Sequence, residues 1–291
     1  MHVKERAVHK TFAQMKRLRL PSGRRAPVLG QGTWGMGEDR TMRRVERSAL
    51  RLGVDLGMTL IDTAEMYGDG QAEALVGEAI ADRREDVFLV SKVLPQHATR
   101  RGTLEACARS LERLNTTYLD LYLLHWRGNV PLAETLQAFQ ELKHDGAIRD
   151  YGVSNFDQSD MEEASTLPGA EEIATDQVLY NLKHRGIEWD VRPWCRERGL
   201  PIVAYSPVDH GDLSDGPALD AIAQRHEATP AQIALAWLLH QDDMIVIPKA
   251  SKPAHVWENR TALDLILTSE DLTELDRAFP PPRKKIPLEM K

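Results

Sequence analysis

The stretch Leu60-Ile61-Asp62-Thr63-Ala64-Glu65-Met66-Tyr67-Gly68 places an acid and a phenol five positions apart, directly after a short apolar run. Two later segments repeat this arrangement, since Val87–Lys92 ends in a lysine and Leu119–His125 ends in a histidine. Each apolar run is typical of a buried strand. In a parallel barrel, catalytic residues come from the C-terminal ends of several strands. We therefore predict one catalytic group at a barrel mouth, composed of Asp62, Tyr67, Lys92 and His125.

A unit of strand, polar loop and amphipathic helix repeats along the rest of the chain. Strands are predicted near Val28–Thr33, Thr59–Ile61, Val87–Ser91, Leu119–His125, Asp150–Ser154, Thr175–Val178, Pro201–Ser206 and Ile245–Pro248. Helices are predicted at Thr41–Leu56, Gln71–Asp82, Arg100–Leu114, Leu132–His144, Ala218–Arg225, Ala231–His240, Pro253–Leu263 and Glu270–Ala278. Strands that alternate with helices form a parallel sheet, and eight such units close a barrel. The predicted fold class is α/β, a (β/α)₈ TIM barrel.

The N-terminal part departs from this repeat. Met15–Leu20 and Ala26–Leu29, on either side of Pro21-Ser22-Gly23, predict a β-hairpin that caps the bottom of the barrel. Residues 1–16 are charged, lack the apolar core of a secretory signal and are predicted to be a flexible extension. Because no linker or composition break divides the remainder, 17–291 is predicted to be a single barrel domain.

Two helices near the C-terminus carry signals for their first residues. Thr229 followed by Pro230 fits an N-cap with proline at the first helical position. Ser269 is predicted to cap the final helix. Beyond that helix, Pro280-Pro281-Pro282 cannot continue a helical structure.

Composition limits the classes of function. The chain has 291 residues, a net charge of −7 and a pI of about 5.8, which argues against a nucleic-acid partner. No apolar run approaches the ~20 residues of a membrane span. Cys107 and Cys195 are far apart, so neither a disulfide nor a metal site is expected, and two incidental thiols suit a cytoplasmic protein. Because no apolar surface stripe is evident, a monomer is expected.

The predicted catalytic residues suit acid–base chemistry. A lysine at the end of a buried strand needs a carboxylate partner, and Asp62 is the natural one for Lys92. A nearby ammonium favours the phenolate, so Lys92 is expected to lower the pKa of Tyr67 from its ordinary value of about 10. Tyr67 would donate a proton to a substrate oxygen, which His125 would orient or polarise.

Short motifs around these residues occur in the order found in a known family. They read Gly30-Gln31-Gly32-Thr33-Trp34, Ile61-Asp62-Thr63-Ala64, Ser91-Lys92-Val93, Leu123-Leu124-His125-Trp126, Gly152-Val153-Ser154-Asn155-Phe156, Asp176-Gln177-Val178, Ala204-Tyr205-Ser206-Pro207 and Ile247-Pro248-Lys249. After Arg17 the chain resembles the aldo-keto reductase family over essentially its whole length. The predicted catalytic residues match that family's Asp–Tyr–Lys–His tetrad in order and in motif. The resemblance implies an NAD(P)H-dependent reductase of aldehydes and ketones.

The resemblance also implies which residues bind the cofactor and the carbonyl substrate. Ser154, Asn155 and Gln177 would bind the nicotinamide carboxamide, and Tyr205 would stack on the nicotinamide ring. The cofactor-binding residues that it implies are Gly32, Thr33, Trp34, Asp62, Ser154, Asn155, Gln177, Tyr205, Ser206, Pro207, Val208, Ile247, Pro248, Lys249, Ala250, His255, Glu258 and Asn259. The substrate-pocket residues that it implies are Trp34, Tyr67, His125 and Trp126.

One segment departs from the family's pattern for the adenosine phosphate. The family usually has a serine after the lysine and an arginine several positions later. Here Ala250 follows Lys249, and His255 stands at the place of the arginine. An arginine binds a phosphate through two hydrogen bonds, and a neutral histidine does not. Lys249, with Lys252, makes NADPH the expected cofactor, and NADH is an alternative.

Two further features indicate a branch of the family. The family's usual glutamate after the tyrosine is displaced, since the chain reads Gly68-Asp69-Gly70-Gln71-Ala72-Glu73. The segments Tyr180-Asn181-Leu182, Arg185-Gly186-Ile187 and Pro193-Trp194-Cys195 resemble bacterial members that reduce small aldehydes such as methylglyoxal. Small aldehydes are therefore the expected substrates. The chain also lacks the long C-terminal tail that shapes steroid-type pockets in the family, so the resemblance implies an open pocket.

Two other functions stay open on the sequence. Lys92 on a barrel strand would suit a Schiff-base aldolase, provided that its pKa lay near neutrality. A cofactor-binding redox sensor with little turnover would keep the same motifs. The charged partner expected for Lys92 argues against the first, and the intact tetrad argues against the second.

Overall fold

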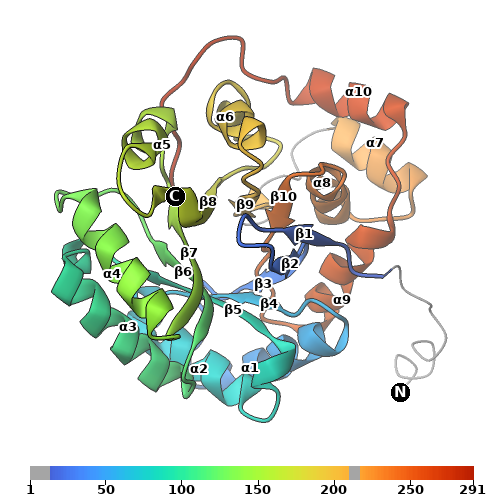
Figure 1. Ribbon diagram of the computed structural model, residues 1–291. Helices are drawn as coiled ribbons and strands as arrows, with labels where there is room; N and C mark the ends of the chain where they lie inside the picture. Colours follow the sequence, from blue (N-terminus) through green and yellow to red (C-terminus); the bar gives the residue numbers. More distant parts are fainter. Residues whose placement is uncertain (1–13, 210–216) are drawn as a thin grey trace.

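The computed structural model describes residues 14–209 and 217–291, and its centre is a parallel barrel (Figure 1). The strands of the barrel are β3 (Gly30–Gly32), β4 (Leu60–Asp62), β5 (Phe88–Val93), β6 (Leu119–Leu124), β7 (Ile148–Ser154), β8 (Ile173–Leu179), β9 (Ile202–Tyr205) and β10 (Met244–Val246). They form one 8-stranded sheet in the order β10-β9-β8-β7-β6-β5-β4-β3, with parallel neighbours throughout. All the predicted strands are confirmed, with small differences at their ends.

The first and last strands meet, which closes the barrel. Parallel bridges join Leu29 to Val246 and Gly32 to Lys249. A Cβ atom on Gly32 would lie 2.9 Å from the carbonyl oxygen of Ile247, so the closure needs a residue without a side chain. The predicted (β/α)₈ barrel is confirmed.

Helices surround the strands in Figure 1. They are α1 (Arg43–Asp55), α2 (Gln71–Ile80), α3 (Arg100–Leu114), α4 (Leu132–His144), α5 (Gln158–Ser165), α6 (Val191–Glu197), α7 (Pro217–Arg225), α8 (Pro230–Leu239), α9 (Pro253–Thr261) and α10 (Ser269–Ala278). Those predicted from periodicity are confirmed, whereas α5 and α6 were not predicted. Helix α5 buries only Met161 and Ala164, which is too few apolar positions for a recognisable period.

The two cap predictions had different outcomes. Thr229 does cap α8, because its side chain accepts a hydrogen bond from the backbone of Gln232. The cap of α10 is Thr268 and not Ser269, so that prediction was wrong by one residue. The Thr268 hydroxyl oxygen accepts from the Asp271 backbone, and the Asp271 carboxylate accepts from the Thr268 backbone. This reciprocal pair defines the helix start better than the serine could.

The core has two layers, inside and outside the strands. Along β6, Leu121 and Leu123 point into the barrel, whereas Tyr122 and Leu124 pack against the helices. Residues of alternate orientation are what a closed barrel requires, since one face of each strand fills the interior. The barrel is therefore a packed body whose free space lies at its two ends.

The predicted hairpin closes one of these ends. Strands β1 (Arg17–Arg19) and β2 (Arg25–Pro27) pair antiparallel, and Ala26 belongs to the inner core layer. Arg24, in the turn, pairs with Asp120 at 2.5 Å and with Asp150 at 3.2 Å. Because those aspartates lie near the starts of β6 and β7, the hairpin caps the bottom of the barrel, as predicted.

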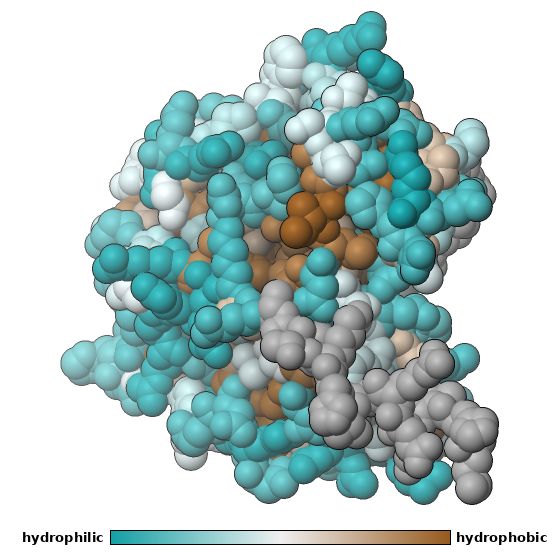
Figure 2. Space-filling view, turned by 90° about the vertical axis from the view of Figure 1, so that its right-hand side faces the viewer, coloured by the Kyte–Doolittle hydropathy of each residue, from teal (hydrophilic) through white to brown (hydrophobic). Residues whose placement is uncertain are grey.

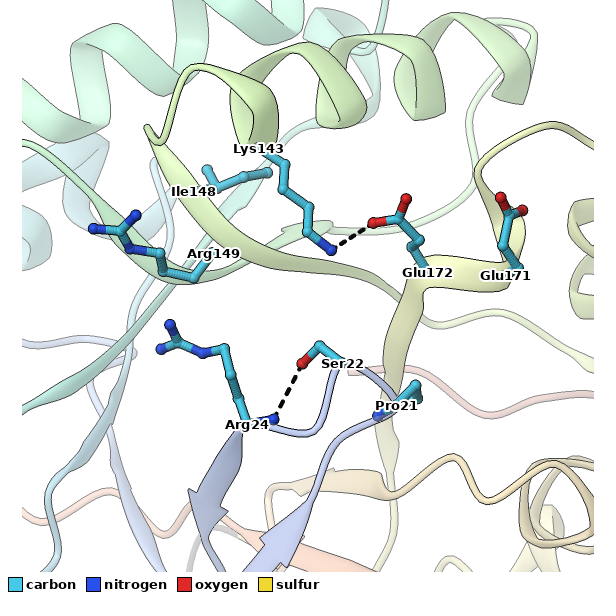
Figure 3. A pocket seen from close by; sticks show the side chains of 8 residues that line it. All are labelled: Pro21, Ser22, Arg24, Lys143, Ile148, Arg149, Glu171 and Glu172. Atoms are coloured by element: carbon cyan, nitrogen blue, oxygen red, sulfur yellow. Dashed lines mark hydrogen bonds and ion pairs between the residues drawn. The ribbon is translucent and has the colours of Figure 1, made fainter.

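A hollow of about 500 Å³ lies beside this cap (Figure 3). Its lining combines the hairpin turn with the end of α4, the start of β7 and the residues before β8. The Lys143 ammonium pairs with Glu172, and Arg149 stacks on the Tyr118 ring at 4.7 Å. The hollow thus has mixed charge, and it lies at the end of the barrel away from the predicted catalytic residues.

The outer surface is mostly polar on the face that Figure 2 shows, with an apolar area near its middle. Residues 1–13 of the predicted extension 1–16 lie outside the described part of the chain. Of the rest, Met15 packs against the core and the Lys16 ammonium pairs with Asp242 at 2.7 Å. None of the described helices is long and apolar enough to span a bilayer.

Candidate active site

The tyrosine is presented by a tight turn after β4. Asp62 is the last residue of β4, and Tyr67 begins a 3₁₀ turn, Tyr67–Gly70. Gly68 and Asp69 in this turn have φ values of 55° and 52°, which directs the chain into α2. The turn places the tyrosine ring above the end of the strand and beside the acid.

The displaced glutamate supports the neighbouring strand. Glu73 is fully buried in α2, where it accepts hydrogen bonds from the Ser91 hydroxyl at 2.5 Å and from Arg113 Nε at 2.6 Å. Ser91 directly precedes Lys92 in β5. Glu73 therefore holds the backbone that carries the lysine.

Lys92 is fully buried and uses its ammonium on three partners. Its Nζ donates to Asp62 Oδ1 at 2.6 Å, to the Thr63 carbonyl oxygen at 2.9 Å and to the Tyr67 hydroxyl oxygen at 3.1 Å. An ammonium has three donors, so none is left unsatisfied. The predicted Asp62–Lys92 pair is confirmed.

The pKa values of this group follow from burial and charge. Burial alone would lower the pKa of Lys92, but the Asp62 carboxylate and the Tyr67 oxygen raise it above its ordinary value. Burial raises the pKa of Tyr67 by more than the Lys92 ammonium lowers it. Lys92 does lower the pKa of Tyr67, as predicted, but the pKa still lies above its ordinary value, because burial outweighs the ammonium and the prediction left out desolvation. The site holds a charged lysine beside a neutral phenol.

His125 follows β6 and faces the tyrosine. Its backbone N–H donates to the Val93 carbonyl oxygen at 2.9 Å, and its ring meets the Tyr67 ring edge-on with centroids 5.8 Å apart. Burial, with the charge of Lys92, lowers the pKa of His125 to about 2. The imidazole is therefore neutral. Its Nδ1 is buried without a partner among the described residues, which favours the tautomer with the proton on Nε2.

The ends of β7, β8 and β9 supply a connected set of polar side chains. Asn155 has a φ of 57°, and its Nδ2 donates to the His125 carbonyl oxygen at 3.0 Å. The Ser154 hydroxyl donates to the Gln177 carbonyl oxygen at 2.8 Å, and Gln177 Nε2 donates to Asp62 Oδ2 at 2.8 Å. The Tyr205 hydroxyl donates to Asn155 Oδ1 at 2.9 Å.

These residues surround one pocket of about 490 Å³ at the C-terminal ends of the strands. The predicted residues that line it are Gly32, Thr33, Trp34, Asp62, Tyr67, His125, Trp126, Ser154, Asn155, Gln177, Tyr205, Ser206 and Ile247. Trp34 is 57% exposed, so this ring forms an open wall. Lys92 lies behind the pocket floor and acts on it through Asp62 and Tyr67.

Three residues that the sequence did not predict also line the pocket: Met66, Met290 and Lys291. Met66 directly precedes Tyr67, so its place in the sequence could have indicated a pocket residue. The last two come from the tail, whose sequence carries no signal for a site. The prediction of an open pocket is corrected in one respect, since Met290 and Lys291 of the tail form part of its wall.

The remaining predicted cofactor residues lie outside this pocket, namely Pro207, Val208, Pro248, Lys249, Ala250, His255, Glu258 and Asn259. Lys249 and Lys252 are exposed at the start of α9, and His255 in its first turn pairs with Glu258 at 2.9 Å. A helix N-terminus with lysines beside it suits an anionic group. This arrangement fits the phosphate of a dinucleotide.

Glu46 joins this phosphate region to the pocket wall, and the sequence did not predict it. It is buried in α1, where it accepts from the Gly37 backbone N–H at 2.9 Å and from the Ser251 hydroxyl at 3.1 Å. Gly37 belongs to the loop that carries Trp34, and Ser251 follows Lys249 by two positions. Within residues 14–209 and 217–291, no three His, Cys, Asp or Glu side chains are placed to hold a metal ion.

Comparisons with known proteins agree with this site. A model described as the Aldo/keto reductase family matches residues 28–279. Methylglyoxal reductase YeaE of Escherichia coli is 48% identical over 282 residues, which cover 95% of this chain and 99% of that protein. Glyoxal reductase of Bacillus subtilis is 33% identical over 262 residues, which cover 89% and 91% respectively.

Solved structures resemble the fold closely. An aldo/keto reductase from Klebsiella pneumoniae, crystallised with NADP and acetate, has a TM-score of 0.92 and 46% identity, and covers 96% of this chain and 100% of its own. The thermostable aldo-keto reductase Tm1743, crystallised with the inhibitor epalrestat, has a TM-score of 0.86 and 42% identity, and covers 91% and 100%.

Proposed function

The chain belongs to the aldo/keto reductase family, and we propose from this premise that its pocket reduces small aldehydes such as methylglyoxal to alcohols with NADPH. The observation that carries the proposal is the contact of the Tyr67 hydroxyl with Lys92 at 3.1 Å, in a pocket that His125 also lines. This contact supplies a proton donor with a cation behind it.

The residues present fit NADPH, which when bound supplies a hydride to the carbonyl carbon. Ser154, Asn155 and Gln177 would hold the carboxamide, and Tyr205 would offer its ring to the nicotinamide. Gln177 already donates its Nε2 to Asp62, so its amide oxygen is the group left for a ligand amide. The phosphate would lie at the start of α9, near Lys249.

The proton chemistry belongs to the protein. Tyr67 is protonated at neutral pH, because the ordinary pKa of a tyrosine is about 10 and burial raises it further. A proton donor must start from this protonated state. The neutral His125 ring would donate its Nε2–H to the carbonyl oxygen and orient it. The charge that develops on Tyr67 as it gives up its proton lies beside Lys92, and Asp62 fixes that ammonium in place.

The same values bear on the aldolase alternative. A Schiff-base nucleophile must be a neutral amine, whereas the pKa of Lys92 is raised above its ordinary value. Its three hydrogen bonds also occupy every donor on the ammonium. The geometry therefore favours reduction over carbon–carbon bond cleavage.

We also propose that 17–291 form the single catalytic domain, that 1–16 extend from it, and that the protein acts as a cytoplasmic monomer.

The reductase proposal is tested by mixing the purified protein with methylglyoxal and NADPH. We expect the absorbance of NADPH to fall, and the absorbance of NADH to fall more slowly in a parallel assay. Absence of turnover with methylglyoxal and with an aromatic aldehyde, despite NADPH binding, would support the sensor alternative instead.

A further inference from the structure

The segment after α10 returns to the barrel mouth and is fastened there at several points. It leaves α10 and runs past α6 toward the C-terminal end of the sheet (Figure 1). Arg185 Nη1 donates to the Phe279 carbonyl oxygen at 2.6 Å, at the start of this segment. Lys285 pairs with Asp190 at 2.9 Å, and His184 with Glu289 at 2.8 Å. We call residues 285–291 the strap.

All of these fastenings come from one short stretch, 184–190, between β8 and α6. It contains Arg185-Gly186-Ile187, a motif whose role the catalytic site does not explain. A Cβ atom on Gly186 would lie 2.9 Å from Cδ1 of Ile286, so the glycine leaves the space that the strap residue fills. The stretch is thus shaped to hold the strap.

The end of the strap contacts Tyr205. The backbone N–H of Lys291 donates to the Tyr205 hydroxyl oxygen at 3.2 Å, and the Lys291 ammonium pairs with the buried carboxylate of Asp209. The Tyr205 hydroxyl in turn donates to Asn155 Oδ1 at 2.9 Å, and Asn155 Nδ2 donates to the His125 carbonyl oxygen at 3.0 Å. A line of hydrogen bonds therefore runs from the strap to the backbone of the catalytic histidine.

From this line we infer that Lys291 is a positioning residue for the cofactor, which acts by holding the Tyr205 ring in place through its hydroxyl. The inference rests on the proposed function, in which Tyr205 stacks on the nicotinamide. The Tyr205 hydroxyl accepts a hydrogen bond from Lys291 and donates another to Asn155. Together the two hydrogen bonds restrict movement of the Tyr205 ring away from the nicotinamide ring on which it would stack. Lys291 takes no part in the proton transfer itself.

The effect of the Lys291 backbone N–H can be measured separately from that of the Lys291 side chain. Lys291→Ala and Lys291→Pro both lose the ammonium that pairs with Asp209, but only the proline lacks the N–H that Tyr205 accepts. We expect the NADPH dissociation constant of Lys291→Pro to exceed that of Lys291→Ala by about fivefold, the effect of one ordinary hydrogen bond. Binding is measured by quenching of tryptophan fluorescence, so the readout does not depend on turnover.

The same pair in a Tyr205→Phe background decides whether the effect passes through the hydroxyl. There the proline and alanine variants should bind NADPH equally, because the acceptor is gone. Equal binding already in the Tyr205 background would overturn the inference, and so would a difference that persists with phenylalanine. If the unaltered protein fails to bind NADPH at all, the proposed function is at fault and not the strap.

A second pair of variants tests whether the contact of the strap with Gly186 affects cofactor binding. Gly186→Val should displace Ile286 and weaken NADPH binding in the same direction as Lys291→Pro. Gly186→Val combined with Ile286→Ala restores the space and should restore binding. If Gly186→Val binds NADPH as tightly as the unaltered protein and has the same unfolding temperature, the contact of Gly186 with the strap does not contribute to cofactor binding.

Discussion

The ammonium of Lys92 donates a hydrogen bond of 3.1 Å to the hydroxyl of Tyr67, yet the pKa of that phenol is raised. Burial of the ring outweighs the favourable charge beside it, so the phenol keeps its proton at neutral pH. The lysine then matters mainly after the proton has left, when it faces a phenolate at hydrogen-bond distance. Tyr67 therefore remains protonated until it reacts, and Lys92 stabilises the phenolate that forms when the proton has been transferred.

Removal of the Tyr67 hydroxyl should abolish reduction while leaving the cofactor site intact. We expect Tyr67→Phe to lower kcat for methylglyoxal by about 10²–10⁴-fold, the usual contribution of a positioned proton donor. NADPH binding by fluorescence quenching should change less than threefold, since the ring remains. Tyr118→Phe, at a tyrosine outside the pocket, is the matched control and should keep full activity.

A Tyr67→Phe variant with more than a tenth of the original kcat would mean that another group supplies the proton. A variant that fails to bind NADPH would mean that the hydroxyl shapes the cofactor site instead.

Loss of the Asp62 charge should destabilise the protein, because it leaves a buried ammonium without a counter-charge. Asp62 accepts from Lys92 at 2.6 Å, and both side chains are almost completely buried. We expect Asp62→Asn to lower the free energy of unfolding by about 3–5 kcal/mol, measured by urea denaturation. Asp62→Asn with Lys92→Met should recover much of this stability and remain inactive. Unchanged stability in Asp62→Asn would contradict the dependence of the lysine on this carboxylate.

The barrel and its tetrad could be predicted because each depends on local sequence. The strands are apolar runs that end in Asp62, Lys92 or His125, and such residues at strand ends must meet in a parallel barrel. The Asp62–Lys92 pair followed from the cost of an unpaired buried ammonium. These arguments need only the period of the sequence and the chemistry of its side chains.

Other features depend on packing between distant segments and could not be predicted. The contact of Lys291 with Tyr205 joins residues 86 positions apart, and nothing in the proline-rich tail indicates where it returns. The pKa of Tyr67 depends on how completely the ring is desolvated, which a sequence does not give. Glu46 was missed for the same reason, since its partners Gly37 and Ser251 meet only in the folded barrel.

The histidine in the site should make the protein less stable in acid. The pKa of His125 is about 2 in the folded protein, well below the ordinary value near 6.5 that applies on unfolding. Between these values the unfolded chain binds a proton that the folded chain does not, so stability is full above pH ~6.5 and falls as the pH is lowered. We expect His125→Asn to reduce the slope of the unfolding free energy against pH, between pH 6 and 4.5, by up to about 1.4 kcal/mol per unit.

Urea denaturation at several pH values measures this slope. His144→Asn, at an exposed histidine, is the control and should leave the slope close to that of the unaltered protein. The same low pKa predicts that no histidine titration appears in the pH profile of kcat between pH 5 and 8. Equal slopes for His125→Asn and the unaltered protein would show that the ring does accept a proton in the folded state.

The histidine at the start of α9 should limit the discrimination between NADPH and NADH. His255 is exposed and pairs with Glu258 at 2.9 Å, so it offers a phosphate one ring nitrogen at most, whereas an arginine offers a fixed charge and two donors. We expect His255→Arg to raise the ratio of kcat/KM for NADPH to that for NADH by about tenfold, the effect of roughly 1.4 kcal/mol. The change should lie in KM for NADPH, with kcat unaltered. His240→Arg, at the end of α8, adds the same charge elsewhere and should leave the ratio unchanged. An equal gain with both cofactors would place the effect on the shared part of the dinucleotide and contradict a phosphate site at His255.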